Sequence, residues 1–346
     1  MEVTFRGSPA HTHARFDVNI MPVEAAPQQL PVSATIRGAY AIDTLALELT
    51  QLSATARSLK LETSGTMARN YSLRLALTVG NLRDLDSLLA TLSPSHRLPD
   101  GVTGRGTFTG NLTGTPAATQ LAGEVALGDF TLPIPLTAAA RQRASTPMRL
   151  ARFDSFTAQV QYSPSQLTLN NARLRRGPED AAFTLSLGLD QGAARGTLPL
   201  RLRADIHSFE IHDLQAILGF DYAISGLTTA TLEVSGTADD PLGSGHLRIA
   251  KAMVDGEPYQ DFSADVVFAN QEAQLANVLI VHNGARVTGT AAYNLKTAAF
   301  RFNLKGSGFN LAQFTQLQLP RISVGGTLNF DARACRCWLI TWTSWK

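Results

Sequence analysis

The chain has 346 residues, with 30 Lys and Arg against 28 Asp and Glu, so it lacks the positive excess that nucleic-acid binding requires. Charged residues make up 17% of the chain and hydrophobic residues 44%, which argues against intrinsic disorder and for a large buried apolar surface. No apolar run approaches the ~20 residues of a membrane-spanning helix. Glu2 and Arg6 interrupt the apolar stretch that a secretory signal would need. We therefore expect a folded protein whose targeting signal, if it has one, precedes residue 1.

Apolar and polar residues alternate along most of the chain beyond residue 30. In residues 72–79, for example, every second residue is Leu or Val and the residues between them are Ser, Arg, Ala and Thr. This period of two predicts antiparallel strands with one apolar and one solvated face. The apolar positions of four such segments are Leu45, Leu47, Leu49, Leu73, Leu75, Leu77, Leu198, Leu200, Leu202, Phe300, Phe302 and Leu304.

Helical patterns are short and few. Residues 84–89, 212–218 and 310–314 each begin with a polar residue and space their apolar residues three or four apart. Each predicts at most two or three turns of helix. We interpret them as corners or lids on a sheet, with docking helices for a partner as the alternative.

An internal repeat supports the all-β prediction. Residues 102–127 align with residues 224–249 without a gap, and a third copy begins at Ile322. A unit of this size contains several strands, far more than a solenoid rung. We divide the chain into a poorly determined segment 1–30, β-units 31–92, 93–218 and 219–319 that each end in a short helix, the start of a further repeat 320–333, and a tail 334–346. Three glycines of the first copy recur in the second: Gly104, Gly114 and Gly123 correspond to Gly226, Gly236 and Gly245.

The tail differs in composition from the rest of the chain. Both cysteines, Cys335 and Cys337, and all three tryptophans fall within the last twelve residues. We predict that residues 334–346 are an aberrant or truncated end. The alternative is a metal or redox Cys-x-Cys with an aromatic membrane anchor, but a closed zinc site needs four ligands. The cysteine-free remainder is compatible with an oxidising compartment such as a periplasm.

The number of strands limits the architecture. About twenty strands spaced ~4.8 Å apart would form a sheet on the order of 90 Å long, and an open sheet of that size must twist. We therefore predict an all-β fold, a long, twisted, mostly antiparallel β-sheet curled into a hydrophobic groove, with a few short helices. A closed barrel or a sandwich would also hide the apolar face. In the groove, the twelve alternating leucines and phenylalanines named above are expected to form the lining.

Three stretches, residues 34–50, 61–66 and 234–247, resemble the AsmA/TamB-like family of bacterial envelope proteins, and the resemblance extends over residues 31–333. It implies a β-groove tethered to the inner membrane by an N-terminal helix and reaching across the periplasm. It also implies a role in moving phospholipid or in assembling outer-membrane proteins. Neither the anchor nor a C-terminal domain has a counterpart in these residues, so we expect an internal fragment.

Signals for chemistry are weak. Asp239 and Asp240 could act as paired carboxylates, but the aligned copy has alanines there and an Asp-Asp-Pro corner is an ordinary turn. The histidines at positions 11, 13, 207 and 212 lack further ligands at metal-binding spacing. Arg173, Arg175 and Arg176 suggest a solvated strand edge more strongly than a lipid-headgroup site. We predict no enzyme activity, no catalytic residue, no cofactor and no metal.

Two functions remain, with an inert repetitive surface protein as a weaker third. In the first, the groove is a conduit that holds phospholipid acyl chains between the inner and outer membrane. In the second, the protein is a scaffold whose edge strand pairs with a segment of an outer-membrane β-barrel protein during its insertion or secretion. A continuous aliphatic lining favours the conduit, because backbone pairing needs only an open edge. Nucleic acid is not an expected partner.

Overall fold

The computed structural model describes residues 2–6, 13–22, 31–86, 98, 100–135, 148–211, 224–254, 256–297, 299–314 and 324–336. The chain divides into two compact units. The strands of the first unit are β1 (Glu2–Arg6), β2 (His13–Ile20), β3 (Val32–Ala41), β4 (Ala46–Ala56), β5 (Leu59–Met67), β6 (Tyr71–Val79), β7 (Thr103–Thr115), β8 (Ala118–Pro135), β9 (Met148–Ser163) and β10 (Gln166–Arg176).

The second unit contains most of β11 and all the strands from β13 onward, and the two-residue β12 (Ala193–Ala194) lies between β11 and β13 in the chain. Its strands are β11 (Glu179–Asp190), β13 (Leu200–Glu210), β14 (Ile224–Gly236), β15 (Pro241–Val254), β16 (Glu257–Pro258), β17 (Asp261–Ala269), β18 (Glu272–His282), β19 (Ala285–Asn294), β20 (Phe300–Asn310) and β21 (Thr327–Arg336).

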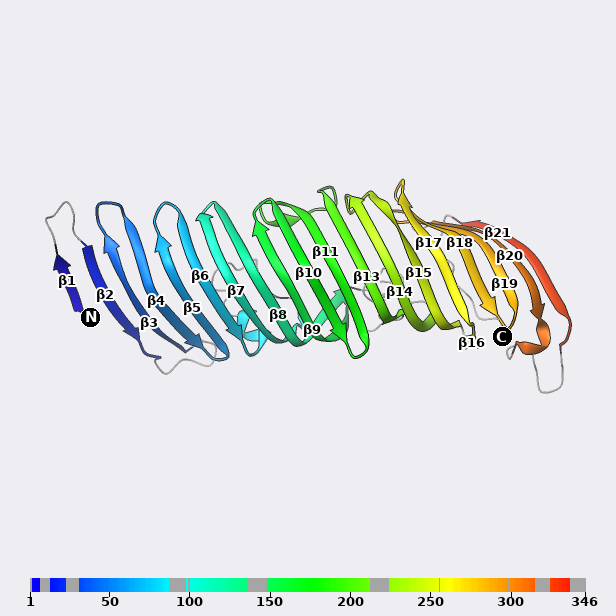
Figure 1. Ribbon diagram of the computed structural model, residues 1–346, viewed down its shortest axis with the longest axis horizontal. Helices are drawn as coiled ribbons and strands as arrows, with labels where there is room; N and C mark the ends of the chain where they lie inside the picture. The colour runs from blue at the N-terminus through cyan, green and yellow to red at the C-terminus, as the bar shows by residue number, and fades with distance from the viewer. Residues whose placement is uncertain are drawn as a thin grey trace. The chain divides into compact units, whose positions relative to one another are not determined.

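The strands pair in chain order (Figure 1). In the first unit β1 to β8 form successive antiparallel pairs, and β9 pairs with β10. In the second unit the order is β11, β13, β14, β15, β17, β18, β19, β20 and β21, again antiparallel throughout. Neither series closes on itself. The prediction of an all-β fold built from an open antiparallel sheet is confirmed.

Helix is a minor part of the described residues. Residues 82–86 are helical, so the first predicted helix, 84–89, begins two residues earlier than predicted, and its last three residues lie outside the described residues. The third prediction, 310–314, corresponds to a 3₁₀ turn, Leu311–Gln313, where the Asn310 side chain accepts a hydrogen bond from the Ala312 amide at 3.0 Å. The second prediction, 212–218, lies outside the described residues. No helix in the described ranges has the length and apolar character needed to span a bilayer.

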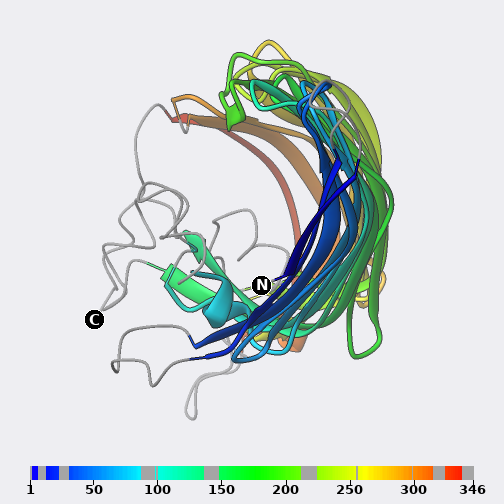
Figure 2. The same cartoon turned by 90° about the vertical axis from the view of Figure 1, so that its left-hand side faces the viewer.

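The strands of each unit bend along their length, as Figure 2 shows for β20 and β21 at the C-terminal end of the second unit. β-Bulges supply part of this bending, because an extra residue in one strand increases the local twist. In β18 the register shifts between Leu275 and Val278, where Asn277 has φ +50°. In β20 it shifts between Gly306 and Phe309, where Gly308 has φ +75°.

The two copies of the internal repeat have the same register. Phe108 pairs with Val125 in the β7–β8 hairpin, and the aligned Ala230 pairs with Leu247 in the β14–β15 hairpin. Each hairpin has a bulge at the same place, in β8 and in β15, and the bulge residues Asp129 and Lys251 are themselves aligned and both have positive φ (+49° and +53°). The repeat is therefore structural and not an accident of composition.

Residues assigned to the ends of the chain partly belong to the sheet. β1 and β2 lie within segment 1–30, which the sequence analysis left poorly determined. β21 continues to Arg336, with Ala334 opposite Phe302 and Cys335 opposite Arg301. The composition change after residue 333 is therefore not a structural boundary. The remainder of the predicted tail lies outside the described residues.

Candidate functional site: the apolar face

Ten of the twelve residues predicted to line a groove lie in strands. Leu45 does not: it is in the turn between β3 and β4, has φ +51° and is 67% exposed. Leu198 lies in the bend before β13, where its amide donates a hydrogen bond to the Arg195 carbonyl at 3.1 Å. These two positions therefore lie outside the strands. The other ten are Leu47 and Leu49 in β4, Leu73, Leu75 and Leu77 in β6, Leu200 and Leu202 in β13, and Phe300, Phe302 and Leu304 in β20.

In the first unit the predicted residues belong to apolar rows that cross several strands. Directly opposed residues of an antiparallel pair lie on the same face of the sheet. Leu77 is opposite both Leu61 and Phe108, and Leu73 is opposite both Gly65 and Leu112. Two such rows include Leu49, Gly65, Leu73, Leu112 and Leu121, and Leu61, Leu77, Phe108 and Val125.

The second unit has longer rows of the same kind. Leu202 is opposite Val234, and Phe302 is opposite Ala291 and Ala334. One row joins Leu185, Leu202, Val234, Gly243, Phe268, Ala273, Tyr293 and Phe300, and a second joins Phe183, Ala204, Leu232, Gly245, Val266, Leu275, Ala291 and Phe302. We call the face formed by these rows, in either unit, the apolar face.

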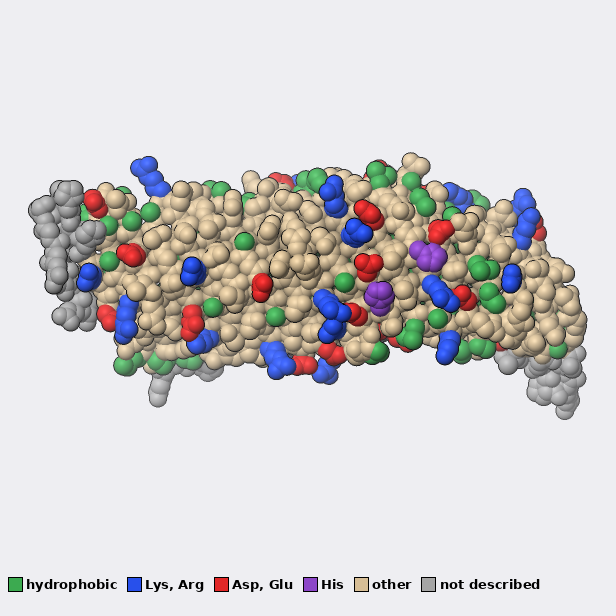
Figure 3. Space-filling model, in the orientation of Figure 1, with side chains coloured by type: hydrophobic (Ala, Val, Ile, Leu, Met, Phe, Trp, Pro, Cys, Tyr) green, Lys and Arg blue, Asp and Glu red, His purple; other side chains and the backbone are tan. Residues whose placement is uncertain are grey.

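The middle of the apolar face is only half covered. Leu75, Leu77, Phe108 and Phe302 are half-buried, so the described residues leave part of each of these side chains accessible. The opposite face is turned to the viewer in Figure 3 and carries scattered charged side chains of both signs, with hydrophobic side chains dispersed among them. Figure 2 places that charged face on the convex side of the bent strands, so the apolar face is the concave one.

Large side chains on the apolar face lie over glycines. A Cβ added to Gly110 or to Gly123 would be 2.8 Å from the Phe108 ring, and one added to Gly306 would be 2.1 Å from the Phe330 ring. Each aromatic ring therefore rests against the backbone of neighbouring residues instead of standing upright. Glycine at these positions keeps the face smooth and open.

Three tightly packed clusters of the buried core lie at one end of the strands. In the first unit Phe130 and Phe153 stack with ring centroids 5.3 Å apart, and both are nearly inaccessible to solvent. In the second unit two apolar clusters occupy the equivalent ends: Ile211, Ile249 and Ala252 form one, and Ala285, Val287 and Phe309 form the other. We call this end of the strands the cluster rim of the groove. The half-buried residues of the apolar rows lie farther along the strands, away from these clusters.

The sequence analysis missed a buried histidine at this rim. His282, at the end of β18, is 2% exposed and its Nδ1 donates a hydrogen bond to the Pro258 carbonyl at 2.7 Å. Its ring packs against Tyr259 and Phe314, with centroids 5.0 and 4.8 Å away. In the sequence, the only indication that His282 is buried was its position at the end of an alternating strand. Because Nδ1 is bonded to the backbone and the ring is buried among aromatic side chains, we assign His282 a structural role.

Replacing His282 should weaken this rim. His282→Ala removes a hydrogen bond and leaves a cavity among aromatic rings, so we expect a loss of about 2–4 kcal/mol in the free energy of unfolding, measured by urea denaturation. His282→Phe keeps the ring but leaves the Pro258 carbonyl unpaired, so the loss should be smaller. Exposed His246→Ala, also in the second unit, should change the free energy by less than about 0.5 kcal/mol. Equal effects of the two alanine variants would contradict the assignment.

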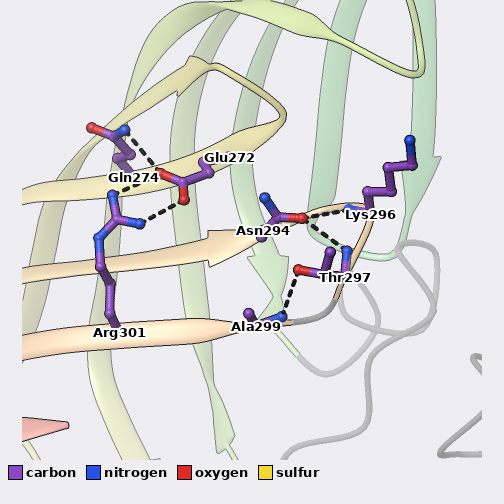
Figure 4. Close-up of polar contacts among 7 residues, drawn as sticks. All are labelled: Glu272, Gln274, Asn294, Lys296, Thr297, Ala299 and Arg301. Carbon is purple, nitrogen blue, oxygen red and sulfur yellow. Dashed lines mark hydrogen bonds and ion pairs between the residues drawn. The ribbon is translucent and has the colours of Figure 1, made fainter. Parts of the chain in front are cut away.

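The convex face carries cross-strand ion pairs. Arg301 of β20 holds Glu272 of β18 in a two-pronged contact, with Nη1–Oε1 and Nη2–Oε2 distances of 2.5 and 2.7 Å (Figure 4). Gln274 donates to the same carboxylate at 3.2 Å. Asp265 accepts hydrogen bonds from Asn277 at 2.7 Å and from His246 at 2.9 Å. These neutralised pairs suit a face that remains in water.

The ion pair sets the pKa of Glu272. Hydrogen bonds from Arg301 favour the carboxylate and lower the pKa of Glu272 below its ordinary value. The pair therefore stabilises the fold above the pKa of the unfolded chain, and this contribution is lost as the pH falls through the lower folded-state value. Arg301→Ala should raise the pKa of Glu272, measured by NMR titration. Hydrogen bonds from Asn277 and His246 lower the pKa of Asp265, which should stay unchanged in the same variant.

The remaining sequence candidates are dispersed. Asp239 and Asp240 form a turn in which the Asp240 amide donates to Thr237 Oγ1 at 3.0 Å and Asp240 Oδ1 accepts from the Gln271 amide at 3.1 Å. The three arginines Arg173, Arg175 and Arg176 lie in β10, and His207 is exposed in β13. His11 and His212 lie outside the described residues.

Together these features define a class of molecule in which each unit is an open antiparallel sheet with a charged convex face and an apolar concave one. Comparison with known proteins adds no identity, since no family model, no curated protein and no solved structure matches the chain. The AsmA/TamB-like resemblance therefore stays a prediction.

Proposed function

We propose that the chain binds phospholipid acyl chains along its apolar face and passes them along the groove, between the inner and outer membrane of a bacterial envelope. The observation that carries this proposal is the continuity of the apolar rows within each unit. A row such as that through Leu202, Val234 and Phe268 offers one apolar side chain or glycine per strand, without a charged residue.

The energetics of acyl-chain binding are adequate. Moving a chain of ~16 methylenes out of water supplies on the order of 13 kcal/mol, at ~0.8 kcal/mol for each buried methylene. Covering the half-buried lining adds a further favourable free energy, because each covered leucine or phenylalanine loses contact with water. Headgroups would stay in water at the rim. Periplasmic location and tethering to the inner membrane belong to this proposal and follow the resemblance described above.

Photo-crosslinking tests the proposal directly. A benzophenone amino acid replaces Leu75 on the apolar face, and a matched variant carries it at Arg74, the exposed neighbour on the convex face. The purified chain is irradiated with phosphatidylcholine vesicles, and the adducts are identified by mass spectrometry. We expect phospholipid adducts at position 75 at least tenfold above those at position 74. Equal labelling at both positions would contradict the proposal.

A further inference from the structure

Tyrosines in the described strands lie only near strand ends. Each of them is within one residue of such an end: Tyr40 in β3, Tyr71 in β6, Tyr162 in β9 and Tyr293 in β19. Phenylalanine shows no such restriction, since Phe108 lies in the middle of β7. The aromatic rings that carry a hydroxyl group therefore have a particular place in the sheet.

These tyrosines belong to the apolar face. In the first unit the outermost row of this face consists of Tyr40, Leu47, Met67, Tyr71, Gly114 and Thr119. In β9, Tyr162 alternates with glutamines and is opposite Leu167. In the second unit Tyr293 belongs to the row through Val234 and Phe268. The tyrosines are thus among the last residues of the apolar face at their end of the strands.

The end that carries the tyrosines is opposite the cluster rim. In the first unit Phe130 lies against Gly104, the second residue of β7, whereas Tyr71 is opposite the last residue but one of β7. In the second unit β19 begins at Ala285, in a buried cluster, and Tyr293 is its last residue but one. We call the end with the tyrosines the tyrosine rim. In each unit the apolar face therefore has two chemically different rims.

The tyrosine rim combines apolar rings with hydroxyl groups. All four tyrosine side chains are half-buried. A Cβ at Gly192 would be 2.8 Å from Tyr162 Oη, so glycine at this position makes room for the hydroxyl. Tyr71 Oη is 3.0 Å from Thr119 Oγ1, which is a hydrogen bond between two members of the outermost row. Hydroxyl groups thus lie where the apolar rows end.

The cluster rim offers a different environment. Phe130 and Phe153 stack with centroids 5.3 Å apart and are nearly inaccessible to solvent. A charged headgroup at this end would meet apolar rings and lose hydration, which is costly. Hydrocarbon placed at the same end would lose nothing. The two rims therefore suit opposite ends of an amphipathic ligand.

We propose that the tyrosine rim binds the ester and phosphate oxygens of a bound phospholipid, so that its acyl chains extend across the apolar face toward the cluster rim. A phenol hydroxyl donates a hydrogen bond to such oxygens, and its ring contacts the adjoining methylenes. Tyrosine gathers at the boundary between water and hydrocarbon in membrane proteins for the same reason. The inference rests on the proposed function and adds to it the orientation of the lipid and the residues that set it.

Removing hydroxyl groups tests this assignment. The double variant Tyr40→Phe, Tyr162→Phe keeps both rings, and Tyr71 stays unchanged because its hydroxyl bonds to Thr119. Titrations use a phosphatidylcholine with a fluorescent acyl chain, and diphenylhexatriene, a hydrocarbon without a headgroup. We expect a roughly three- to tenfold loss of affinity for the phosphatidylcholine and an unchanged affinity for diphenylhexatriene.

The matched control removes a hydroxyl at the cluster rim. Tyr259→Phe makes the same chemical change beside His282 and should alter neither affinity. Unchanged affinity of the double variant for phosphatidylcholine would overturn the proposal. Equal losses for the two probes would also overturn it, because the hydroxyls would then not act on the headgroup end.

Crosslinking with two labelled lipids separates this inference from the proposed function. One phosphatidylcholine carries a diazirine in its headgroup, the other at the end of an acyl chain, and the crosslinked residues are mapped by mass spectrometry. We expect the headgroup label at the tyrosine rim in about fivefold or greater excess over the cluster rim. A headgroup label shared equally by the two rims, with the acyl label still on the apolar face, would overturn the orientation alone. If neither label attached to the apolar face, the proposed function would be wrong as well.

Discussion

Leu75→Asp is expected to slow phospholipid transfer by about a hundredfold, and Phe302→Arg should do the same in the second unit. Each change puts a charge on the half-buried apolar face. An acyl chain that passes such a site must desolvate an unpaired charge, which costs several kcal/mol, and about 3 kcal/mol corresponds to a hundredfold in rate. The measurement is transfer of a fluorescent phospholipid between donor and acceptor vesicles, at equal concentrations of folded protein.

The controls are neighbouring residues on the convex face. Arg74→Asp and Asn303→Arg introduce the same side chains one residue away, at exposed positions, and should leave transfer nearly unchanged. Arg301 is not suitable as a control, because its replacement would break the contact with Glu272. If charges on the two faces slowed transfer equally, the apolar face would not be the lipid path.

Gly104→Ala should have the largest effect on stability. The new Cβ would lie 2.5 Å from Phe130 Cβ and 2.6 Å from Phe130 Cα, so the β8 backbone would have to move. Alanine also avoids the glycine's φ of +128°. Strain and displaced packing together should lower the free energy of unfolding by about 3 kcal/mol or more. Urea denaturation followed by far-ultraviolet circular dichroism measures this loss.

Gly177→Ala separates the two causes. Gly177 also has positive φ, +53°, but no atom of the described residues lies within 4 Å of the added Cβ. Only the backbone strain remains, and we expect a loss of about 1 kcal/mol. A loss at Gly177 as large as that at Gly104 would show that close packing against Phe130 contributes nothing.

The sequence predicted the strands and their faces well, because side chains alternate strictly in extended chain. Leu73, Leu75 and Leu77 lie on one face of β6 as expected, and the repeat alignment predicted two hairpins that have the same register. The same signal was present and overlooked at β2, where Ala14, Phe16 and Val18 alternate with polar residues.

Local departures from alternation could not be predicted. Leu45 continues the apolar alternation but lies in a turn, where its φ is +51°. The sequence could not indicate this, because nothing in a leucine side chain favours a positive φ. In β18 the extra residue at Asn277 reverses the phase, so Leu275 and Val278 share a face although they are three residues apart. His282 was overlooked because a lone histidine gives no spacing pattern. The role in lipid transport remains a prediction from the resemblance and from the apolar rows.

The order of pairing has a consequence for how the protein unfolds. Nearly every strand touches only the strands before and after it in the chain, as in β4 between β3 and β5. The free energy of unfolding is then close to a sum of terms for neighbouring strands, as in repeat proteins. The residues in contact are also separated by few positions in the sequence. Amide exchange should therefore be graded along the chain instead of uniform, with slow exchange inside a hairpin such as β14–β15 and faster exchange in strands that pair on one side only. A strand could open at the edge while the interior of the sheet remains intact.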